Sequence, residues 1–384
     1  MTQRRLWLLR GASVALGCLA GFGIIEAVGA IGLHFIRHAA KPELPAAIEA
    51  QILSRGRSPE TVPDPYLLYK PKPSQQTPHA RTNRYGLRGP EIDELPEPNV
   101  YRILLLGGSV AWGYTARDDS ETISEALERY LNAHRERSPT LAGKTVEVLN
   151  GAVPGYVTWQ EALAYSIYHR KLDPRLIVTL DGANDYYAAI VSQQVGVPMR
   201  FRASEQTYLA STPTLSEAIG GWLRYRVHKL KIAKYLRHLR RPNLVELAPP
   251  SAAEVVGSYR QALEHLADIA VISDAAVMPV LQPMLILPDA KPLTAFERQF
   301  IGYYDLQIPG INAAYDGVFE TIRKMFAQLD AERAEVFPFD ATGVFADETA
   351  ITYVDHCHLT PRGRYLLAAA IGEHILEILD GRGA

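Results

Sequence analysis

Short apolar runs alternate with longer amphipathic segments over most of the chain, which is the pattern of parallel β-strands joined by α-helices. The apolar runs are four to eight residues long, the usual length of buried strands. They lie at Ile103 to Leu106, Val146 to Leu149, Arg175 to Leu180, Val277 to Gln282 and Glu335 to Pro338. The pattern therefore predicts an α/β fold with an open, mostly parallel sheet.

Capping residues mark the starts of the predicted helices. Capping boxes begin at Thr158 and Ser251, each with glutamate three residues later. Thr360 precedes Pro361, and proline is favoured in the first turn of a helix. Residues 118–120 supply N-cap residues for the helix that follows the first strand. A further helix is predicted from Ile311 to Leu329.

The longest apolar run covers residues 11–36, interrupted by Glu26 and His34, and it is long enough to cross a bilayer. Three arginines precede it, within residues 1–10. Because basic residues stay on the cytoplasmic side, we expect a single-pass signal anchor in the cell membrane. The chain from residue 37 onwards would then lie outside the cytoplasm, in the periplasm of a Gram-negative cell.

A cleaved signal peptide, with secretion of the rest of the chain, is the main alternative. Val28-Gly29-Ala30 offers small residues for cleavage, but apolar residues continue beyond that point, which favours the anchor. Lipoprotein processing at Cys18 fits less well, because Ala15-Leu16-Gly17 is a poor match for such a site. Glu26 is an unusual residue for a membrane span, and either a contact with a partner or a position near the far half of the bilayer would explain it.

The composition is that of an ordinary globular protein: 47% of the 384 residues are hydrophobic and 21% are charged. A net charge of -2 gives no sign of nucleic-acid binding. Cys18 and Cys357 do not make a disulfide framework. Residues 37–100 are rich in proline and polar residues and are expected to connect the anchor to a domain at 101–384. Within them, the turn-rich Thr82 to Glu91 is expected to form an ordered loop that caps the sheet.

A basic insertion is predicted at about 190–250. Arg224 to Arg241 contains eight Lys or Arg and no acid, and its apolar residues do not form one continuous stripe. A basic helix of this kind can lie on anionic lipid or bind an anionic polymer. The alternative is a solvated helix that covers the flank of the sheet.

The first strand ends in Gly107-Gly108-Ser109, ahead of the first helix. Glycines at the end of a strand permit a tight turn and a close approach of other groups. A phosphate-binding loop would need Lys and then Ser or Thr after its last glycine, whereas Gly113 is followed by Tyr114-Thr115. The dinucleotide motif G-x-G-x-x-G is also absent here. Ser109 is therefore a candidate nucleophile, and the alternative is a glycine-rich turn without a chemical role.

Two further strands end in turns that contain glycine and amide residues. Residues 150–156, with Gly155, follow the second strand, and residues 181–185, with Asn184, follow the third. In an open parallel sheet the carboxyl ends of the strands meet at one edge, where ligands bind. We therefore expect these two turns to converge with the turn that contains Ser109.

A candidate general base lies ahead of the last helix, in Asp355-His356-Cys357-His358. His358 could take the proton of Ser109 while Asp355 binds its other ring nitrogen. A metal site is an alternative, but four neighbouring side chains cannot all point at one ion and no second ligand cluster is evident. A structural role at the start of the last helix is a further alternative.

Taken together, these segments resemble the SGNH hydrolases, the GDSL-like lipase and acylhydrolase superfamily. Four segments of this chain are similar to the four conserved blocks of that family. Gly107 to Val110 is similar to the nucleophile block, and Asn150 to Tyr156 to the glycine block. Gly182 to Asp185 is similar to the asparagine block, and Asp355 to His358 to the D-x-x-H block. The match covers residues 101–380. Thr82 to Glu91 is also similar to a segment found before the nucleophile in membrane-anchored or secreted bacterial members. One departure is Gly108, where the family usually has Asp.

The resemblance implies a three-layer α/β/α, flavodoxin-like fold with a mostly parallel five-stranded sheet after an N-terminal transmembrane helix. It implies that Ser109 is the nucleophile, His358 the general base and then acid, and Asp355 the orienting carboxylate. The oxyanion hole would consist of the backbone N–H groups of Ser109 and Gly155 and the side-chain amide of Asn184. No cofactor or metal is implied. An α/β-hydrolase is the nearest rival, but it places its Asp and His on separate loops.

We therefore expect an extracytoplasmic serine ester hydrolase or O-acyltransferase that works through an acyl-enzyme. The expected substrate is an O-acyl group of an envelope or secreted polysaccharide, and a lipid ester, as for a lysophospholipase, is the second class. An anchored, non-catalytic binding or assembly subunit that keeps the fold is the alternative from another class. The expected partners are the acylated substrate and the membrane, with contact to an anionic polymer or lipid through Arg224 to Arg241.

Overall fold

The computed structural model describes residues 3–38, 45–46, 59–199, 226–227, 230–239 and 249–381. The chain divides into two compact units, residues 1–42 with 211–243 and residues 43–210 with 244–384. Both ends of the predicted basic segment, including Arg224, Arg240 and Arg241, lie outside the described residues.

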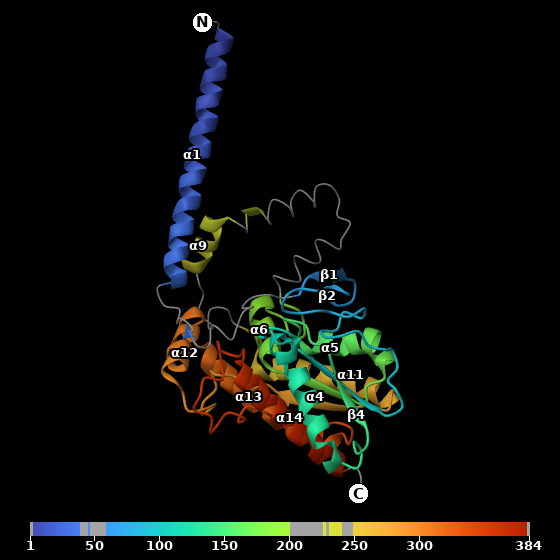
Figure 1. Cartoon of the computed structure of the whole chain (residues 1–384). Helices are drawn as coiled ribbons and strands as arrows, with labels where there is room; N and C mark the ends of the chain where they lie inside the picture. Colours follow the sequence, from blue (N-terminus) through green and yellow to red (C-terminus); the bar gives the residue numbers. More distant parts are fainter. Residues whose placement is uncertain are drawn as a thin grey trace. The chain divides into compact units, whose positions relative to one another are not determined.

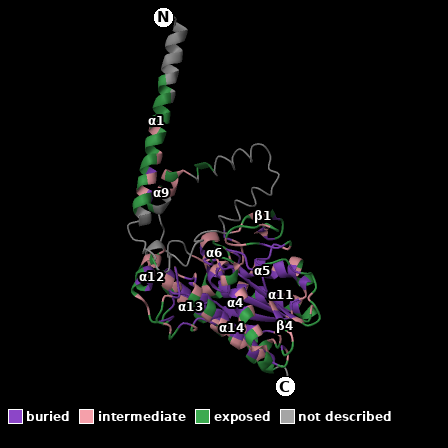
Figure 2. Ribbon diagram, viewed as in Figure 1, coloured by how far each residue is buried: buried purple, intermediate pink, exposed green. Residues whose placement is uncertain are grey.

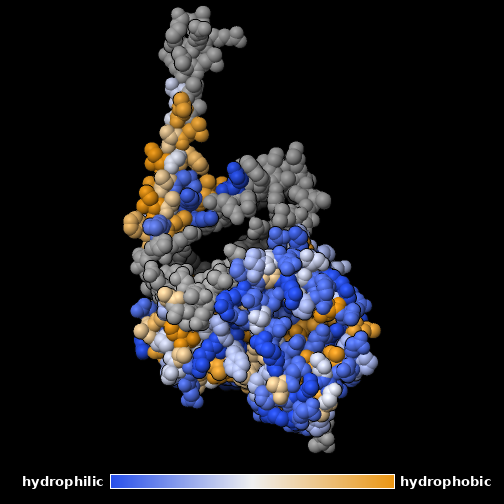
Figure 3. Space-filling view, viewed as in Figure 1, coloured by the Kyte–Doolittle hydropathy of each residue, from blue (hydrophilic) through white to orange (hydrophobic). Residues whose placement is uncertain are grey.

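The first unit contains the long helix α1 (Gln3–His38). Its stretch Leu16–Phe35 is long and apolar enough to span a membrane, and a signal sequence would meet the same criterion. The apolar side chains of this stretch are mostly exposed, as Figure 3 shows along the helix; Leu19 and Phe35, for example, are 68% and 64% exposed. The predicted apolar helix is therefore present.

Helix α9 (Lys231–Leu239) packs against α1 within the same unit. The carboxylate of Glu26 accepts hydrogen bonds from the backbone N–H groups of Lys231 and Ile232, at 2.9 and 3.2 Å. A Cβ atom at Gly29 would overlap the backbone of Ile232, so the small residue permits this close approach. Glu26 thus lies at the N-terminus of α9, where a negative charge is favourable, and the acid in the apolar run has an intramolecular partner.

The second unit is built on a five-stranded parallel sheet in the order β4-β3-β5-β6-β7. Counted along the chain, this is the order 2-1-3-4-5 of flavodoxin-like folds. The strands are β3 (Val100–Gly107), β4 (Thr145–Asn150), β5 (Leu176–Asp181), β6 (Ala276–Leu281) and β7 (Phe339–Asp340). The predicted fold class is confirmed.

Helices cover both faces of this sheet (Figure 1). On one face α4 (Ile123–His134) packs against α14 (Pro361–Gly381). On the other, α11 (Ala252–Ile272) packs between α5 (Thr158–Ala164) and α13 (Ile311–Glu332). Figure 2 shows that the buried residues are concentrated in the sheet and on the helix sides that face it. Strand β3, an inner strand of the sheet, is entirely apolar from Ile103 to Leu106 because helices cover both of its sides.

Three boundary predictions were wrong. Glu335 to Pro338 is not the fifth strand: Val336 makes only an isolated bridge, and β7 begins after Pro338, which has no N–H for the ladder. Helix α4 is capped by Thr122, whereas residues 119–121 form a separate 3₁₀ turn. Thr158 is the first helical residue of α5 rather than its cap, and its hydroxyl donates to Asp185 at 3.0 Å.

Helices α6 (Ala183–Ser192) and α12 (Ala295–Gln307) were not predicted.

Two other helix starts were predicted correctly. Ser251 caps α11, and its side chain and that of Glu254 form the expected capping box. Thr360 precedes α14, with its hydroxyl accepting the N–H of Gly363 at 3.2 Å. Local capping chemistry was therefore a reliable guide where tertiary contacts did not compete for the capping side chain.

The segment before β3 is ordered and lies against the sheet. It contains an antiparallel hairpin of β1 (Thr61–Asp64) and β2 (Leu68–Pro71). Further on, the backbone N–H of Arg88 donates to the carbonyl of Asn150 at 2.9 Å, which attaches the segment to the end of edge strand β4. The region predicted as a connection thus supplies structure at the edge of the sheet where the candidate site lies.

Candidate active site

Ser109 stands at the junction between β3 and the short helix α3 (Ser109–Trp112). Its Oγ atom lies 2.8 Å from Nε2 of His358, and both side chains are partly exposed to solvent. The ring of Tyr114 packs beside that of His358, with 5.0 Å between the ring centroids. A hydroxyl within hydrogen-bond distance of an imidazole is the geometry of a nucleophile with its general base.

The loop before α14 folds around the carboxylate of Asp355. Oδ2 of Asp355 lies 2.8 Å from Nδ1 of His358. Oδ1 accepts the backbone N–H groups of Cys357 and His358, at 3.1 and 2.8 Å. The carboxylate therefore fixes the tautomer in which Nδ1 carries a proton and Nε2 faces Ser109.

Charges within the loop shift the pKa values of its groups. Burial opposes ionisation of Asp355, but the charge of His358 and its hydrogen bonds lower the pKa of this carboxyl far below the usual range. Burial likewise opposes protonation of His358, but Asp355 and then the Cys357 thiolate raise the pKa of His358 well above its ordinary value. Burial would also raise the pKa of Cys357, yet the charges of His356 and His358 lower it to about 7.

The turns after β4 and β5 lie next to the serine turn. Gly155 has a φ of +84°, a conformation that glycine adopts without strain. Asn184 lies in the first turn of α6, and its Nδ2 donates to the carbonyl of Tyr156 at 2.8 Å. The N–H of Val153 bonds the carbonyl of Gly107 at 2.9 Å. These contacts join the three turns that contain Ser109, Gly155 and Asn184.

Gly108, the departure from the family pattern, has a steric cause in this chain. A Cβ atom at position 108 would overlap Nδ2 of Asn184. Any larger residue would have to displace the amide that the resemblance places in the oxyanion hole. The close packing of Asn184 over Gly108 thus explains why aspartate does not fit here without a shift.

Sequence reasoning missed Arg88, which holds the helix that begins at Ser109. This buried guanidinium donates to the carbonyls of Trp112 and Gly113, at 2.8 and 2.9 Å, and pairs with Asp119 at 2.8 Å. Orphan carbonyls at the end of α3 are thereby satisfied. The available signal was its place in the turn-rich Thr82 to Glu91.

Sequence reasoning also missed Arg364, in α14. Its Nη1 donates to the carbonyl of Leu359 at 2.8 Å and to the hydroxyl of Thr115 at 2.9 Å. Its Nη2 pairs with Glu121 at 3.1 Å. Burial lowers the pKa of Arg364 to about 10, which still leaves it charged at neutral pH. The residue connects the turn after α3 to the loop of the candidate base, and nothing in the sequence around it indicated this role.

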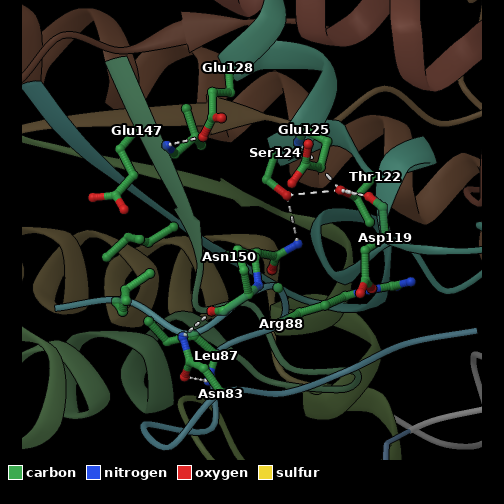
Figure 4. Close-up of a pocket in the computed structure, with 15 residues that line it drawn as sticks. Asn83, Leu87, Arg88, Asp119, Thr122, Ser124, Glu125, Glu128, Glu147 and Asn150 are labelled. Atoms are coloured by element: carbon green, nitrogen blue, oxygen red, sulfur yellow. Dashed lines mark hydrogen bonds and ion pairs between the residues drawn. The ribbon is translucent and has the colours of Figure 1, made fainter. Parts of the chain in front are cut away.

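A cavity of about 110 Å³ lies beside the nucleophile helix and contains none of the three candidate catalytic residues (Figure 4). Arg88, Asp119, Ser124 and Asn150 are among its lining residues. Asn150 donates through Nδ2 to the Ser124 hydroxyl at 3.2 Å and to the carbonyl of Ala111 at 3.1 Å. The residues around this cavity therefore support α3, and we do not assign the cavity to substrate.

Three carboxyl groups are buried beside the Asn184 turn. Asp181 ends β5, Asp185 lies in the first turn of α6 and Glu161 lies on α5. Burial and then the charge of Asp185 raise the pKa of Asp181 to about 7, and burial raises that of Asp185 to about 6. Burial, followed by the charge of Asp181, raises the pKa of Glu161 well above its usual value. Asp185 is anchored by the backbone N–H and hydroxyl of Thr158.

The loop that contains Asp355 and His358 was also considered as a metal site. Donor atoms of Asp355, Cys357 and His358 lie within 4.8 Å of one another. His358, however, directs Nδ1 to Asp355 and Nε2 to Ser109, so a metal ion bound by these three groups would have to replace one of those contacts. The arrangement in the structure is that of a hydrogen-bonded Ser-His-Asp chain.

The strand order and the placement of Ser109, His358 and Asp355 are those expected from the resemblance of the sequence to the SGNH hydrolases. The serine follows the first strand of a 2-1-3-4-5 sheet, and His358 and Asp355 share one loop before the last helix. No protein-family model and no curated protein sequence matches the chain.

Several solved structures are similar to this one at low sequence identity. One, described as lipolytic and of the G-D-S-L family, is from Desulfitobacterium hafniense DCB-2, with 9% identity, coverage of 72% of this chain and 99% of that chain, and a TM-score of 0.38. An acetyl-xylooligosaccharide esterase variant from Geobacillus has 12% identity, coverage of 72% and 94%, and a TM-score of 0.39. A two-domain esterase active on acetylated mannans has 9% identity, coverage of 73% and 50%, and a TM-score of 0.38.

Proposed function

We propose that this protein is a serine ester hydrolase of the SGNH type. The observation that carries the proposal is the hydrogen-bonded chain from Ser109 Oγ through the His358 ring to Asp355, with distances of 2.8 Å at each step. A serine hydroxyl is a weak nucleophile until a positioned base takes its proton, and the imidazole here stands in that position.

In the proposed reaction, Nε2 of His358 takes the proton of Ser109 while Oγ attacks the acyl carbon. The tetrahedral oxyanion would be held by the N–H groups of Ser109 and Gly155 and by the amide of Asn184. His358 then gives the proton to the leaving alcohol, and an acyl group stays on Ser109. Water, activated by the same histidine, releases the acid. A sugar hydroxyl in place of water would make the enzyme an O-acyltransferase.

The proposed substrate is an O-acyl group of an envelope or secreted polysaccharide. The family resemblance and the predicted extracytoplasmic placement both favour this class, with a lipid ester as the second candidate. Release of acetate from acetylated xylan, compared with hydrolysis of a lysophospholipid, separates the two. Both assays use the full chain in detergent, with Ser109→Ala as the inactive control.

We further propose that α1 is an uncleaved anchor and that the active unit lies outside the cytoplasm. The support is the apolar helix with its basic N-terminus. Alkaline carbonate extraction should leave the full-length protein in the membrane, whereas a cleaved or peripheral protein would be released.

Hydrolysis of p-nitrophenyl acetate tests the enzymatic proposal. Ser109→Ala should lower the rate by about 10⁴-fold or more, because both steps need the nucleophile. Ser74→Ala, at an exposed position outside the site, is the matched control and should keep the full rate. Equal rates for all three proteins would favour the alternative of a non-catalytic anchored subunit.

A further inference from the structure

A second pocket, of about 180 Å³, lies in the unit that contains the sheet. It is formed by the hairpin β1–β2, the turn at 84–87, the turn after β4 and the helical residues that follow α5. Ser109, Asp355 and His358 are not among its lining residues. Its volume is several times the ~30 Å³ that one water occupies in the liquid, so it can hold a small organic ligand.

The lining of this pocket carries positive charge. Lys70, Arg84 and Lys171 line it together with His169, and none of the lining residues is acidic. Lys70 pairs with Asp64 at 3.0 Å and Lys171 with Glu94 at 2.8 Å, but neither carboxylate belongs to the lining. Within the described parts of the chain, Arg84 has no carboxylate at ion-pair distance from its guanidinium.

Tyrosine rings hold these three cations in place. Nζ of Lys70 lies 4.2 Å from the centroid of the Tyr168 ring. The guanidinium carbon of Arg84 and Nζ of Lys171 each lie 4.9 Å from the centroid of the Tyr85 ring. Cation–π contacts of this kind restrict side chains that would otherwise adopt many conformations in solvent. The positive groups are therefore arranged around the pocket before a ligand arrives.

An independent feature of the same pocket is a buried histidine with an unsatisfied nitrogen. His169 is only 8% exposed, and its Nδ1 has no hydrogen-bond partner. Burial, and then the charge of Lys70, lower the pKa of His169 to about 4, so that the ring is neutral at pH 7. Buried polar atoms are normally paired, so this unpaired nitrogen is an unusual feature of a residue in the pocket wall.

We propose that this pocket binds an anionic sugar unit, one whose carboxylate or phosphate lies against Arg84 and whose ring fills the rest of the pocket. The planar guanidinium of Arg84 can form two parallel hydrogen bonds with a carboxylate or a phosphate. Lys70 and Lys171 add positive charge on the adjoining walls. The pocket is too large for a bare carboxylate, and Leu67, Leu87 and Val153 in its lining offer apolar surface to a sugar ring.

The pocket adjoins the candidate active site through one turn. Val153 and Tyr156 line it, and Gly155 lies between them. The carbonyl of Tyr156 also accepts the amide of Asn184. An anionic glycan held here would lie next to the turn that the proposed oxyanion hole uses, so the pocket is a second subsite for a charged polysaccharide. The binding claim itself does not depend on catalysis.

Isothermal titration calorimetry on the full-length Ser109→Ala protein tests the proposal, with glucuronate, glucose 6-phosphate and glucose as probes. We expect one or both anionic sugars to bind and glucose to bind at least about tenfold more weakly, because glucose lacks the charged group that hydrogen-bonds to Arg84. The anionic sugar that binds more tightly shows whether the pocket prefers a carboxylate or a phosphate. Equal affinity for glucose, or no heat with either anionic sugar, would overturn the proposal.

Variants connect the binding to the pocket. Arg84→Gln should weaken binding of the anionic sugar by about tenfold, whereas Arg129→Gln, an exposed arginine on α4, should not. Arg84 is exposed, so its replacement leaves the core intact, and an unchanged circular dichroism spectrum would verify this. With Ser109 intact, Arg129→Gln should leave p-nitrophenyl acetate hydrolysis unchanged, because Arg129 is exposed on α4 and does not line the pocket. Binding that is insensitive to Arg84→Gln would refute the assignment even if the esterase assay succeeds.

Discussion

Nε2 of His358 lies 2.8 Å from Oγ of Ser109, although the two residues are 249 positions apart in the chain. Groups outside the Ser-His-Asp chain hold them together. The hydroxyl of Thr115, six residues after the serine, donates to the carbonyl of Leu359 at 2.7 Å, and Arg364 binds both of these groups. The position of the base thus depends on buried hydrogen bonds that have no direct part in the proposed chemistry.

Replacement of Arg364 by Met should lower both activity and stability. Removal of one partner of a buried ion pair costs about 3–5 kcal/mol, and at about 2–4 °C per kcal/mol the Tm should fall by about 10 °C. The milder Thr115→Val should lower kcat several-fold with little change in KM, because only the position of His358 is disturbed. Kinetics and thermal unfolding measure the two effects. Arg362→Ala, at an exposed neighbour of Arg364, should change neither.

The aspartate that the family usually has after its first glycine should harm this chain. In Gly108→Asp the new side chain must push the Asn184 amide away, which removes one oxyanion donor. Loss of such a donor typically costs about 10²–10³ in kcat. The Tm should change little, because Asn184 is a flexible side chain that can move at low cost. Gly257→Ala, where a Cβ meets no atom within 4 Å, is the control. A Gly108→Asp enzyme with full activity would contradict the role of Asn184.

The pH dependence of kcat/KM should report the raised pKa of His358. A general base works only without its proton, so the rate should rise with pH through a value above the ordinary histidine pKa of about 6.5. Asp355→Asn removes the largest contribution that raises this pKa. The acid limb of the profile should therefore move to lower pH while the rate falls by about 10³–10⁴. Asp347→Asn, on the surface, should leave the profile in place. A limb that Asp355→Asn does not move would argue against the Asp355–His358 contact.

The buried carboxyls should make the protein less stable as the pH rises. Folded-state pKa values of about 7 for Asp181 and about 6 for Asp185 lie above the usual 3.8. A group with a raised pKa stabilises the fold fully below its unfolded pKa, and this contribution is lost as the pH rises through the folded value. We therefore expect the Tm to fall between pH 5 and pH 8.

Asp181→Asn, which carries no charge at any pH, should reduce that fall in Tm. Asp274→Asn is the matched control, because Asp274 is almost fully exposed and pairs only with Arg175 at the surface. Thermal unfolding monitored by circular dichroism at both pH values measures the difference. An identical pH dependence for wild type and Asp181→Asn would show that Asp181 is ionised normally in the fold.

The sequence was sufficient for the central strands and for the residues of the candidate site. Ile103 to Leu106 could be assigned because a strand covered on both faces is apolar at every position. Ser109, Gly155 and Asn184 could be expected at one edge because parallel strands end there. The position of β7 could not be predicted, because a strand of only two residues after Pro338 has no hydrophobic periodicity to detect.

The supporting arginines could not be predicted for a different reason. Arg88 and Arg364 bind backbone carbonyls of Trp112 and Leu359, and a carbonyl acceptor leaves no trace in the sequence. Thr158 was assigned as a cap because its spacing fits one, but in the folded chain its hydroxyl binds Asp185. Side-chain roles set by tertiary partners, rather than by neighbours in the chain, were the ones that pattern reasoning missed.

Labelling with a fluorophosphonate probe tests the proposed nucleophile most directly. The full-length protein should be labelled covalently, and peptide mass spectrometry should place the label on Ser109. Labelling should disappear in Ser109→Ala and slow strongly in His358→Ala, while Ser74→Ala should be labelled at the wild-type rate. A wild-type protein that is folded but unlabelled, or labelled at a serine other than Ser109, would contradict the account.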